Sequence, residues 1–327
     1  MVCLRTCCIA ALLLFQVSIA EARPRPQLSR RLLPERVYRD AMDRAIHALR
    51  GKGGIARLDQ RLRTLVVPDL HARRDYLVRV LGSRDVKTGA RYLDLVRRGE
   101  LQVVLLGDGM HAEGRAAGRW AQADRRPNGR AMRREAAESL GTMKLVMELK
   151  AAHPAHFHYL KGNHDNILDE RRHGNWPVSK YAERHGEGAL LKQLIRRRFG
   201  DGFLERYHEF ERRLPLVAVG SGFALAHSGP GQVVPRRAIQ RRQARAVESF
   251  TWTDLTHDPR RQDRLARQQL RELGVPDGFF LAGHRPTRRV RQQGSFFQLN
   301  NERQMFFAVL EPGRPFNPRR DVRNASR

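Results

Sequence analysis

Five apolar runs of this chain are each followed by aspartate, asparagine or histidine. The runs are Leu65–Val67, Val103–Leu106, Phe157–Leu160, Phe223–Ala226 and Phe279–Ala282, and the residues after them are Asp69, His71, Asp108, Asn163, His164, His227 and His284. In open α/β sheets, the ends of strands project side chains into one crevice at the sheet edge. A single residue of this kind usually caps a turn or a helix. Seven of them at five strand ends predict one shared site.

Strand-like runs alternate with helical patterns from about Leu32 onward. Strands are expected at Thr64–Val67, Gln102–Leu106, Phe157–Leu160, Leu216–Val219, Phe223–Ala226, Phe279–Ala282, Ser295–Leu299 and Met305–Leu310. Helices are expected at Glu35–Leu49, Asp75–Leu81, Arg130–Ala152, Val178–Arg198, Phe203–Arg213 and Pro259–Leu273. The first half has a βαβ pattern, whereas the last third is richer in strands with short turns. This order predicts a mixed α/β fold in which helices cover the sheets.

The N-terminal residues 1–22 have the features of a secretory signal peptide. Arg5 supplies a positive charge, the stretch from Cys7 to Ala20 is almost wholly apolar, and Ala20-Glu21-Ala22 offers a cleavage site. All three cysteines lie in this segment, so a chain cut near Ala22 contains none. We therefore expect a periplasmic or secreted protein without a stable membrane span. An uncleaved membrane anchor is the alternative, although the apolar run is short for a spanning helix.

The charge is strongly positive, with 62 lysines and arginines against 34 aspartates and glutamates and a net charge of +28. Such a field attracts phosphates, nucleic acid or anionic surfaces. However, the arginines are spread along the chain, and aromatic residues make up only 7% of it. Base stacking needs aromatic platforms, so nucleic acid is a possible partner but not the favoured one.

The residues at the strand ends are also a set of metal donors. Carboxylate, imidazole and amide groups suit Mn²⁺, Fe or Zn²⁺. Two metal ions held close together need a shared ligand, and a carboxylate can bridge them.

Five short motifs contain these residues in order along the chain. They read Pro68-Asp69-Leu70-His71-Ala72, Gly107-Asp108-Gly109-Met110-His111, Gly162-Asn163-His164-Asp165, His227-Ser228-Gly229 and Gly283-His284. Over about Leu65 to Leu310 the chain resembles the calcineurin-like metallophosphoesterases, of the serine/threonine phosphoprotein phosphatase type. The resemblance implies a layered α/β/β/α sandwich with two mixed sheets flanked by helices. It also implies hydrolysis of phosphoric esters.

The resemblance further implies two divalent metal ions, Mn, Fe or Zn, and a role for each residue. Asp69, His71 and Asp108 would hold the first ion. Asp108 would bridge to the second, which Asn163, His227 and His284 would complete. A metal-bridging hydroxide would attack phosphorus in line, and His164 would donate a proton to the leaving oxygen. Arg115 and Arg285 are the candidates to bind the phosphate.

The second motif departs from the family pattern. The family has an aspartate that orients the proton-donating histidine, and this chain has His111 there, followed by Ala112 in place of arginine. Glu113 and Arg115 are the nearby residues that could take over these two roles. In the first motif, Pro68 and Ala72 replace glycines.

The implied layout begins with the signal peptide at 1–22. A linker follows at 23–34 and starts with the sequence Arg-Pro-Arg-Pro. Residues 35–311 would form the metallophosphoesterase domain, with helical insertions near 115–150 and 171–213. Residues 312–327, with three prolines, are expected to be a flexible tail.

We therefore expect an exported, metal-dependent phosphoesterase that hydrolyses phosphomonoesters, either phosphoproteins or small molecules. The basic charge leaves open a phosphodiesterase or a nucleotide polyphosphate hydrolase. The departure at His111 leaves open a catalytically weakened relative that binds polyanions.

Overall fold

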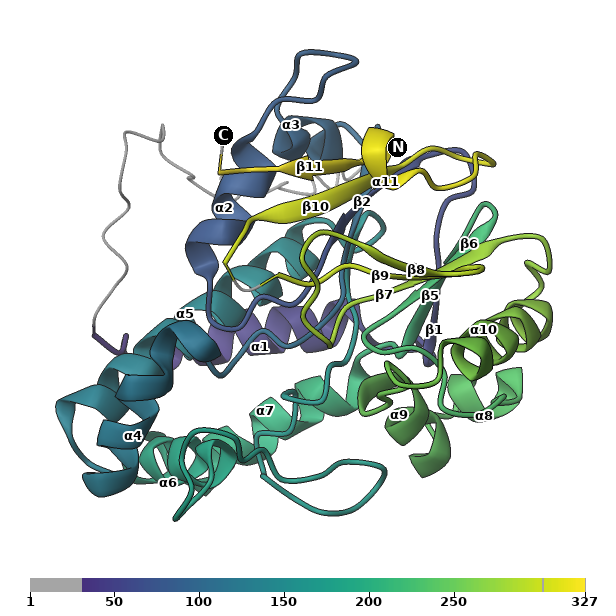
Figure 1. Ribbon diagram of the computed structural model, residues 1–327. Helices are drawn as coiled ribbons and strands as arrows, with labels where there is room; N and C mark the ends of the chain where they lie inside the picture. The colour runs from purple at the N-terminus through teal and green to yellow at the C-terminus, as the bar shows by residue number, and fades with distance from the viewer. Residues whose placement is uncertain (1–30, 302, 327) are drawn as a thin grey trace, which may run out of the picture.

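Two β-sheets stacked face to face form the centre of the protein (Figure 1). The computed structural model describes residues 31–301 and 303–326. One sheet contains β2 (Arg63–Val67), β3 (Leu101–Leu105), β4 (Phe157–Tyr159), β10 (Phe306–Leu310) and β11 (Val322–Asn324) in the order β11-β10-β2-β3-β4. The other contains β1 (Ile55–Arg57), β5 (Val217–Gly220), β6 (Phe223–Ala226), β7 (Phe279–Ala282), β8 (Arg291–Gln293) and β9 (Phe296–Gln298) in the order β1-β5-β6-β7-β9-β8.

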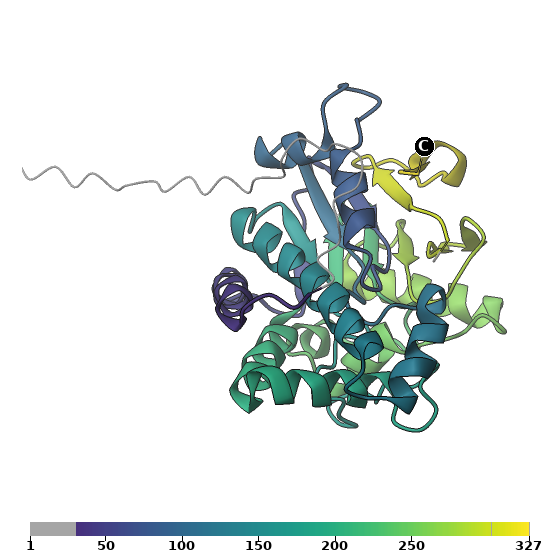
Figure 2. The same ribbon diagram turned by 90° about the vertical axis from the view of Figure 1, so that its left-hand side faces the viewer.

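Helices cover the outer face of each sheet. Beside the five-stranded sheet are α1 (Glu35–Ala48), α2 (Arg74–Gly82), α3 (Tyr92–Arg97), α4 (Ala117–Arg125), α5 (Arg130–Ala152), α6 (Glu187–Phe199) and α7 (Asp201–Arg213). Beside the six-stranded sheet are α8 (Arg236–Gln240), α9 (Ala244–Thr251) and α10 (Pro259–Leu273). The view in Figure 2 shows α1 and α5 packed together on the side away from the six-stranded sheet. The layers therefore run α/β/β/α, which confirms the predicted fold class.

Alternation along the strands divides the apolar residues between three cores. On β2, Leu65 and Val67 pack with the helices, whereas Val66 packs between the two sheets. On β6, Ala224 faces the helices and Leu225 faces the neighbouring sheet. Successive side chains of a strand point to opposite faces, so continuous apolar runs are what strands buried on both faces require.

Strand direction brings the predicted site residues to one edge. In the five-stranded sheet, β2, β3 and β4 are parallel neighbours, and α5 is the crossover helix between β3 and β4. In the six-stranded sheet, β6, β7 and β9 are parallel neighbours. The loops after these six strands meet where the two sheets lie against each other, because the side chain of His227 after β6 contacts the carbonyl of Leu106 after β3.

Most predicted elements are present within a residue or two, but the helix expected at Val178–Arg198 begins only at Glu187. Residues 178–186 instead form turns. Gly186, at φ +79°, is in a left-handed conformation that interrupts the helix. The backbone N–H groups of Lys180 and Tyr181 are bound by the carboxylate of Glu187 rather than by helical carbonyls.

The C-terminal residues are not a frayed tail, so this part of the sequence prediction is wrong for the described residues up to 326. They form a short helix, α11 (Pro318–Asp321), and β11, which pairs antiparallel with β10. Phe316 explains the order, because it is only 8% exposed and its ring lies 5.4 Å from that of Phe279 and 4.9 Å from that of Phe297. The core between the sheets thus extends into the tail.

The predicted signal peptide at 1–22 and most of the linker at 23–34 lie outside the described residues. Among the residues that the structure does describe, no helix is both long and apolar enough to cross a membrane.

We predict that Phe316→Ala lowers the free energy of unfolding by about 3 kcal/mol, because it opens a cavity between aromatic rings. Denaturant unfolding of the purified protein measures this change. The exposed neighbour Arg314 is the control, and Arg314→Ala should change stability by less than about 0.5 kcal/mol. Equal stability of the two variants would contradict the described packing of the tail.

Candidate metal centre

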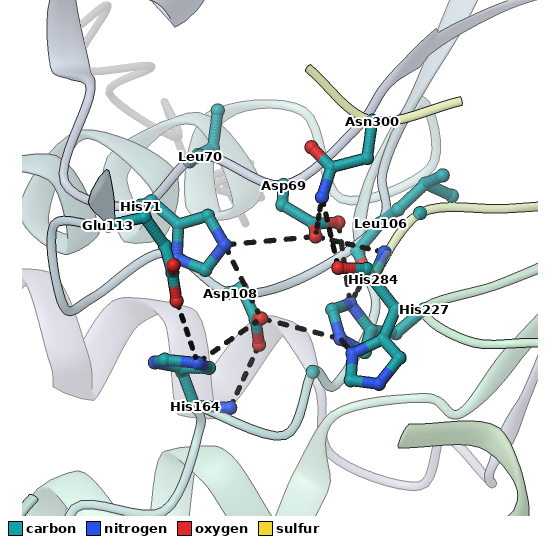
Figure 3. A network of polar contacts seen from close by, with 12 residues as sticks. Asp69, Leu70, His71, Leu106, Asp108, Glu113, His164, His227, His284 and Asn300 are labelled. Carbon is teal, nitrogen blue, oxygen red and sulfur yellow. Dashed lines mark hydrogen bonds and ion pairs between the residues drawn. The ribbon is translucent and has the colours of Figure 1, made fainter. Parts of the chain in front are cut away.

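Loops that follow six strands supply the polar side chains of the site (Figure 3). The contributing strands and residues are β2 with Asp69 and His71, β3 with Asp108, β4 with Asn163 and His164, β6 with His227, β7 with His284, and β9 with Asn300. Every one of the predicted metal ligands is therefore at this edge, as the strand-end pattern indicated. They form two groups that share Asp108, one with Asp69 and His71 and the other with His227 and His284.

The second group is closely spaced around the side chain of His227. Its Nε2 lies 2.8 Å from Asn163 Oδ1, 3.1 Å from His284 Nδ1 and 3.3 Å from Asp108 Oδ2. His284 Nδ1 also lies 3.1 Å from Asn163 Oδ1. Donor atoms bound at about 2.0–2.2 Å from one cation are separated by roughly 3 Å. The spacing of this group is therefore that of a coordination shell.

The first group is slightly more open. His71 Nε2 lies 3.8 Å from both Asp69 Oδ2 and Asp108 Oδ2. All three side chains are almost completely buried. A cation placed between them would neutralise two carboxylates that water does not reach.

Backbone carbonyls fix the orientation of two of the imidazole rings. His71 Nδ1 donates to the carbonyl of His111 at 3.1 Å, and His227 Nδ1 donates to the carbonyl of Leu106 at 3.0 Å. A carbonyl accepts only from a protonated nitrogen, so in the neutral form of each ring, which is the form that binds a metal ion, the lone pair is on Nε2 and faces the carboxylates. This is the arrangement that holds histidines as metal ligands.

Asn300 is a site residue that was not predicted from the sequence. It is buried, and its Nδ2 donates to Asp69 Oδ2 at 2.7 Å, beside the backbone N–H of His284 at 2.9 Å. The two donors hold one oxygen of Asp69, and Oδ1 is left without a hydrogen bond. Asn300 directly follows the predicted strand Ser295–Leu299, so the strand-end rule could have found it.

The motif glycines are required by close approach to the carboxylates. A Cβ atom on Gly162 would lie 2.0 Å from Asp108 Oδ1, and one on Gly283 would lie 2.2 Å from Asp69 Oδ1. Several other residues adopt left-handed backbone conformations, with φ of +51° at Asp108, +59° at Ala72 and +69° at His284. Such conformations cost energy outside glycine and cluster at functional sites. The tight turn of the first motif is thus formed despite alanine in place of glycine.

The electrostatics of the site favour a cation. Burial raises the pKa of Asp108 well above its ordinary value, and Asp69 and Asp165 nearby raise it further. Burial alone would lower the pKa of His227, but the charges of Asp108 and Asp69 raise it to about 9. Carboxylates buried this deeply are stable only when paired with positive charge. The donor set and the charge therefore both fit divalent metal ions.

Asp165 supports the loop that presents Asp108. Its carboxylate accepts from the backbone N–H of Gly162 at 2.7 Å and from the hydroxyl of Tyr159 at 2.7 Å, and the same hydroxyl accepts from the N–H of Gly109. Burial raises the pKa of Asp165 to about 6. The second and third motifs are thereby joined through the side chains of Asp165 and Tyr159.

His164 lies on the other side of Asp108 from His227 (Figure 3). Its Nε2 is 3.9 Å from Asp108 Oδ2 and 3.6 Å from Glu113 Oε1. Burial and the neighbouring His71 and His111 lower the pKa of His164, and the carboxylate of Glu113 acts in the opposite direction. Glu113 is therefore located where the missing orienting aspartate would act.

His111 does not take that role. Its ring is buried and packs 5.2 Å from the ring of His164 and 6.0 Å from that of Trp120. Neither ring nitrogen has a hydrogen-bond partner among the described residues, and burial lowers the pKa of His111 to about 4. A neutral ring contributes packing here, whereas its backbone carbonyl orients His71.

The two arginines expected to bind phosphate have different surroundings. Arg115 donates to the carbonyls of His71 and Ala72 and pairs with Glu138 at 3.3 Å, so its guanidinium braces the first motif and the placement does not support phosphate binding. Arg285 pairs with Asp254 through Nε at 3.0 Å, and its side chain is 43% exposed. Arg285 directly follows His284 in the sequence, so it remains a candidate for binding phosphate.

The comparisons with known proteins agree with this geometry. The sequence model of the calcineurin-like phosphoesterase family matches residues 62–309. The chain belongs to the calcineurin-like phosphoesterase family. No curated protein matches it.

The chain also aligns with several solved structures. A protein serine/threonine phosphatase from Saccharomyces cerevisiae, described as similar to human phosphatase PP5, aligns over 89% of this chain and 90% of its own, with a TM-score of 0.57 and 12% identity. A cold-active protein-tyrosine phosphatase of a psychrophilic Shewanella aligns over 82% and 80%, with a TM-score of 0.41 and 13% identity. A putative diadenosine tetraphosphatase aligns over 83% and 97%, with a TM-score of 0.39 and 14% identity.

Within this calcineurin-like phosphoesterase, we predict that Asn300→Ala weakens metal binding about 10- to 100-fold, because Asp69 loses the donor that orients it. Titration of the chelator-stripped protein with Mn²⁺ or Zn²⁺ measures the affinity. Asn301→Ala is the matched control, because among the described residues the side chain of Asn301 hydrogen-bonds to backbone groups and not to Asp69. Equal metal affinity in both variants would remove Asn300 from the site.

Proposed function

We propose that this protein hydrolyses phosphomonoesters with the help of two divalent metal ions, Mn²⁺, Fe or Zn²⁺. The observation that carries the proposal is the pair of donor groups that share the buried carboxylate of Asp108. When bound, a pair of such ions supplies positive charge for the phosphate and a water of lowered pKa. Asp69 and His71 would hold one ion, Asn163, His227 and His284 the other, and Asp108 both.

The remaining chemistry is a proton transfer to the leaving oxygen. His164 lies beside Asp108, and its ring is almost buried. A buried imidazole loses its proton unless a negative charge faces it. Glu113 supplies that charge and opposes the lowering of the pKa of His164 by burial, and we assign to the protonated form of His164 the donation from Nε2.

Three observations favour monoester hydrolysis over the other functions considered. The carboxylate of Glu113 faces His164, although the aspartate of the family pattern is replaced by His111 in this chain. This contact weakens the case for a non-catalytic relative. A structural neighbour with the same layered fold is named a serine/threonine phosphatase. His284 is followed by Arg285-Pro286-Thr287, without the second histidine that we associate with the phosphodiesterase branch.

The proposal includes export, which rests on the N-terminal sequence. The charge on Arg5 and the apolar stretch to Ala20 support a cleaved signal peptide and a periplasmic or secreted enzyme. N-terminal sequencing of the protein from a cell envelope or culture medium fraction tests this part. A mature N-terminus near Arg23 is the expected result.

We predict that the chelator-stripped protein does not hydrolyse an aryl phosphate and that added Mn²⁺ or Zn²⁺ restores turnover. Asp108→Asn should lower kcat by about 10³-fold or more, because it removes the shared negative charge of both donor groups. Asp94→Asn, at an exposed position of α3, is the control and should behave as the wild type. Turnover that survives both metal removal and Asp108→Asn would overturn the proposed function.

We also predict that Glu113→Gln lowers kcat by about 10²-fold with metal affinity unchanged. The carboxylate favours protonated His164, so its loss lowers the pKa of that ring and moves the alkaline limb of the kcat profile to lower pH. Rates measured from pH 5 to 9 show the shift. Glu100→Gln, at an exposed position, is the control. An unmoved profile would mean that another group orients His164.

A further inference from the structure

Residues 166–186, between β4 and α6, place Lys180 near His164, the proposed proton donor. The ammonium of Lys180 lies 2.5 Å from Glu113 Oε2, and the hydroxyl of Tyr181 donates to the same oxygen at 3.0 Å. The other oxygen of Glu113 is the one that faces His164 at 3.6 Å. One carboxylate therefore stands between the proton donor and a cation.

The backbone of this lysine is held firmly in place. The N–H groups of Lys180 and Tyr181 donate to the carboxylate of Glu187, the former at 2.8 Å. Four residues further on, the N–H groups of Arg184 and His185 donate to Asp124 of α4 at 3.0 and 3.1 Å. The backbone is thus anchored at Lys180 itself and again at Arg184 and His185.

Three other cations near the site are engaged elsewhere. Arg115 donates to two backbone carbonyls, and Lys161 donates to the carbonyl of Asp165. Arg73 is buried and donates to the carbonyls of Asp69 and Leu70. The side chain of Lys180, by contrast, is 50% exposed, so its ammonium has donors available for a ligand.

The pairing with Glu113 keeps this lysine charged. Burial opposes the charge, but the hydrogen bond and the charge of Glu113 raise the pKa of Lys180 above its ordinary value. A charged lysine acts as a point charge toward phosphate and binds a dianion more strongly than a monoanion.

We propose that Lys180 binds the phosphate of the substrate and makes the site selective for phosphomonoester dianions over diester monoanions; this inference rests on the proposed function. Glu113 holds both partners, with one oxygen toward His164 and the other toward Lys180. The cation that contacts the phosphate and the acid that protonates the leaving group are then positioned by the same side chain.

The test uses the full mature protein loaded with Mn²⁺. Calorimetric titration with inorganic phosphate gives an affinity that does not depend on turnover. Lys180→Met should weaken phosphate binding about 10- to 100-fold, because it removes one charge-assisted hydrogen bond. Lys180→Arg should recover most of the affinity. Lys87→Met is the matched control, since Lys87 is also an exposed lysine paired with a glutamate, Glu311 at 2.9 Å.

Kinetics test the selectivity. In Lys180→Met, kcat/KM for an aryl phosphate should fall about 10-fold or more, mainly through KM, while kcat/KM for a bis-aryl phosphate changes little. Phosphate affinity in Lys180→Met equal to that of the wild type would show that the lysine only braces Glu113 and would overturn the inference. The same conclusion follows if the wild type binds no phosphate, or if the two substrates lose activity equally.

The experiments give different results when the proposed function is wrong and when the inference about Lys180 is wrong. If phosphate affinity depends on Lys180 but the wild type hydrolyses neither ester with any metal, the lysine binds phosphate as inferred and the enzyme assignment fails. If turnover is lost in Asp108→Asn but phosphate affinity is indifferent to Lys180→Met, the enzyme assignment stands and the inference fails.

Discussion

The burial of Asp108 between two sheets is the constraint on which the rest of the site depends. Its carboxylate faces His71, His164 and His227, and its backbone carbonyl accepts from the N–H of His71. A charge buried this way costs several kcal/mol unless it is compensated. The fold compensates it with donors from three strand ends, and the charge that remains fits a divalent cation at this centre. The same interactions therefore bear on local stability and on the candidate metal site.

Accommodating this carboxylate determines the backbone around it. Asp108 and Ala72 adopt left-handed conformations, and no side chain fits at Gly162. Strained residues of this kind persist only where surrounding structure over-determines them. Here the surrounding structure is the contact of Asp165 and Tyr159 with the loop, together with the two-sided burial of β2 and β3. The layered core thus provides the rigidity that the strained loops need.

The strand-end pattern predicted which polar side chains meet at this edge, because parallel neighbouring strands place their carboxyl ends side by side. Asn300 obeys the same rule, because it directly follows the predicted strand Ser295–Leu299. The three-residue strands β1, β8 and β11 carry too little periodicity to be recognised. The contact between Lys180 and Glu113 joins residues 67 positions apart, and no local pattern in either segment indicates it.

The replacement of the family's orienting aspartate by His111 changes more than one residue. With the carboxylate at Glu113, directly before the 3₁₀ turn Gly114–Ala116, the acid group faces outward to residues 166–186 as well as inward to His164. An aspartate at the position of His111 would be buried beside Trp120 and would not face residues 166–186. The shift therefore couples His164 to a segment outside the two sheets. If Lys180 binds phosphate as we propose, variation in that segment changes substrate selectivity without disturbing the candidate metal ligands, which all lie on strand ends.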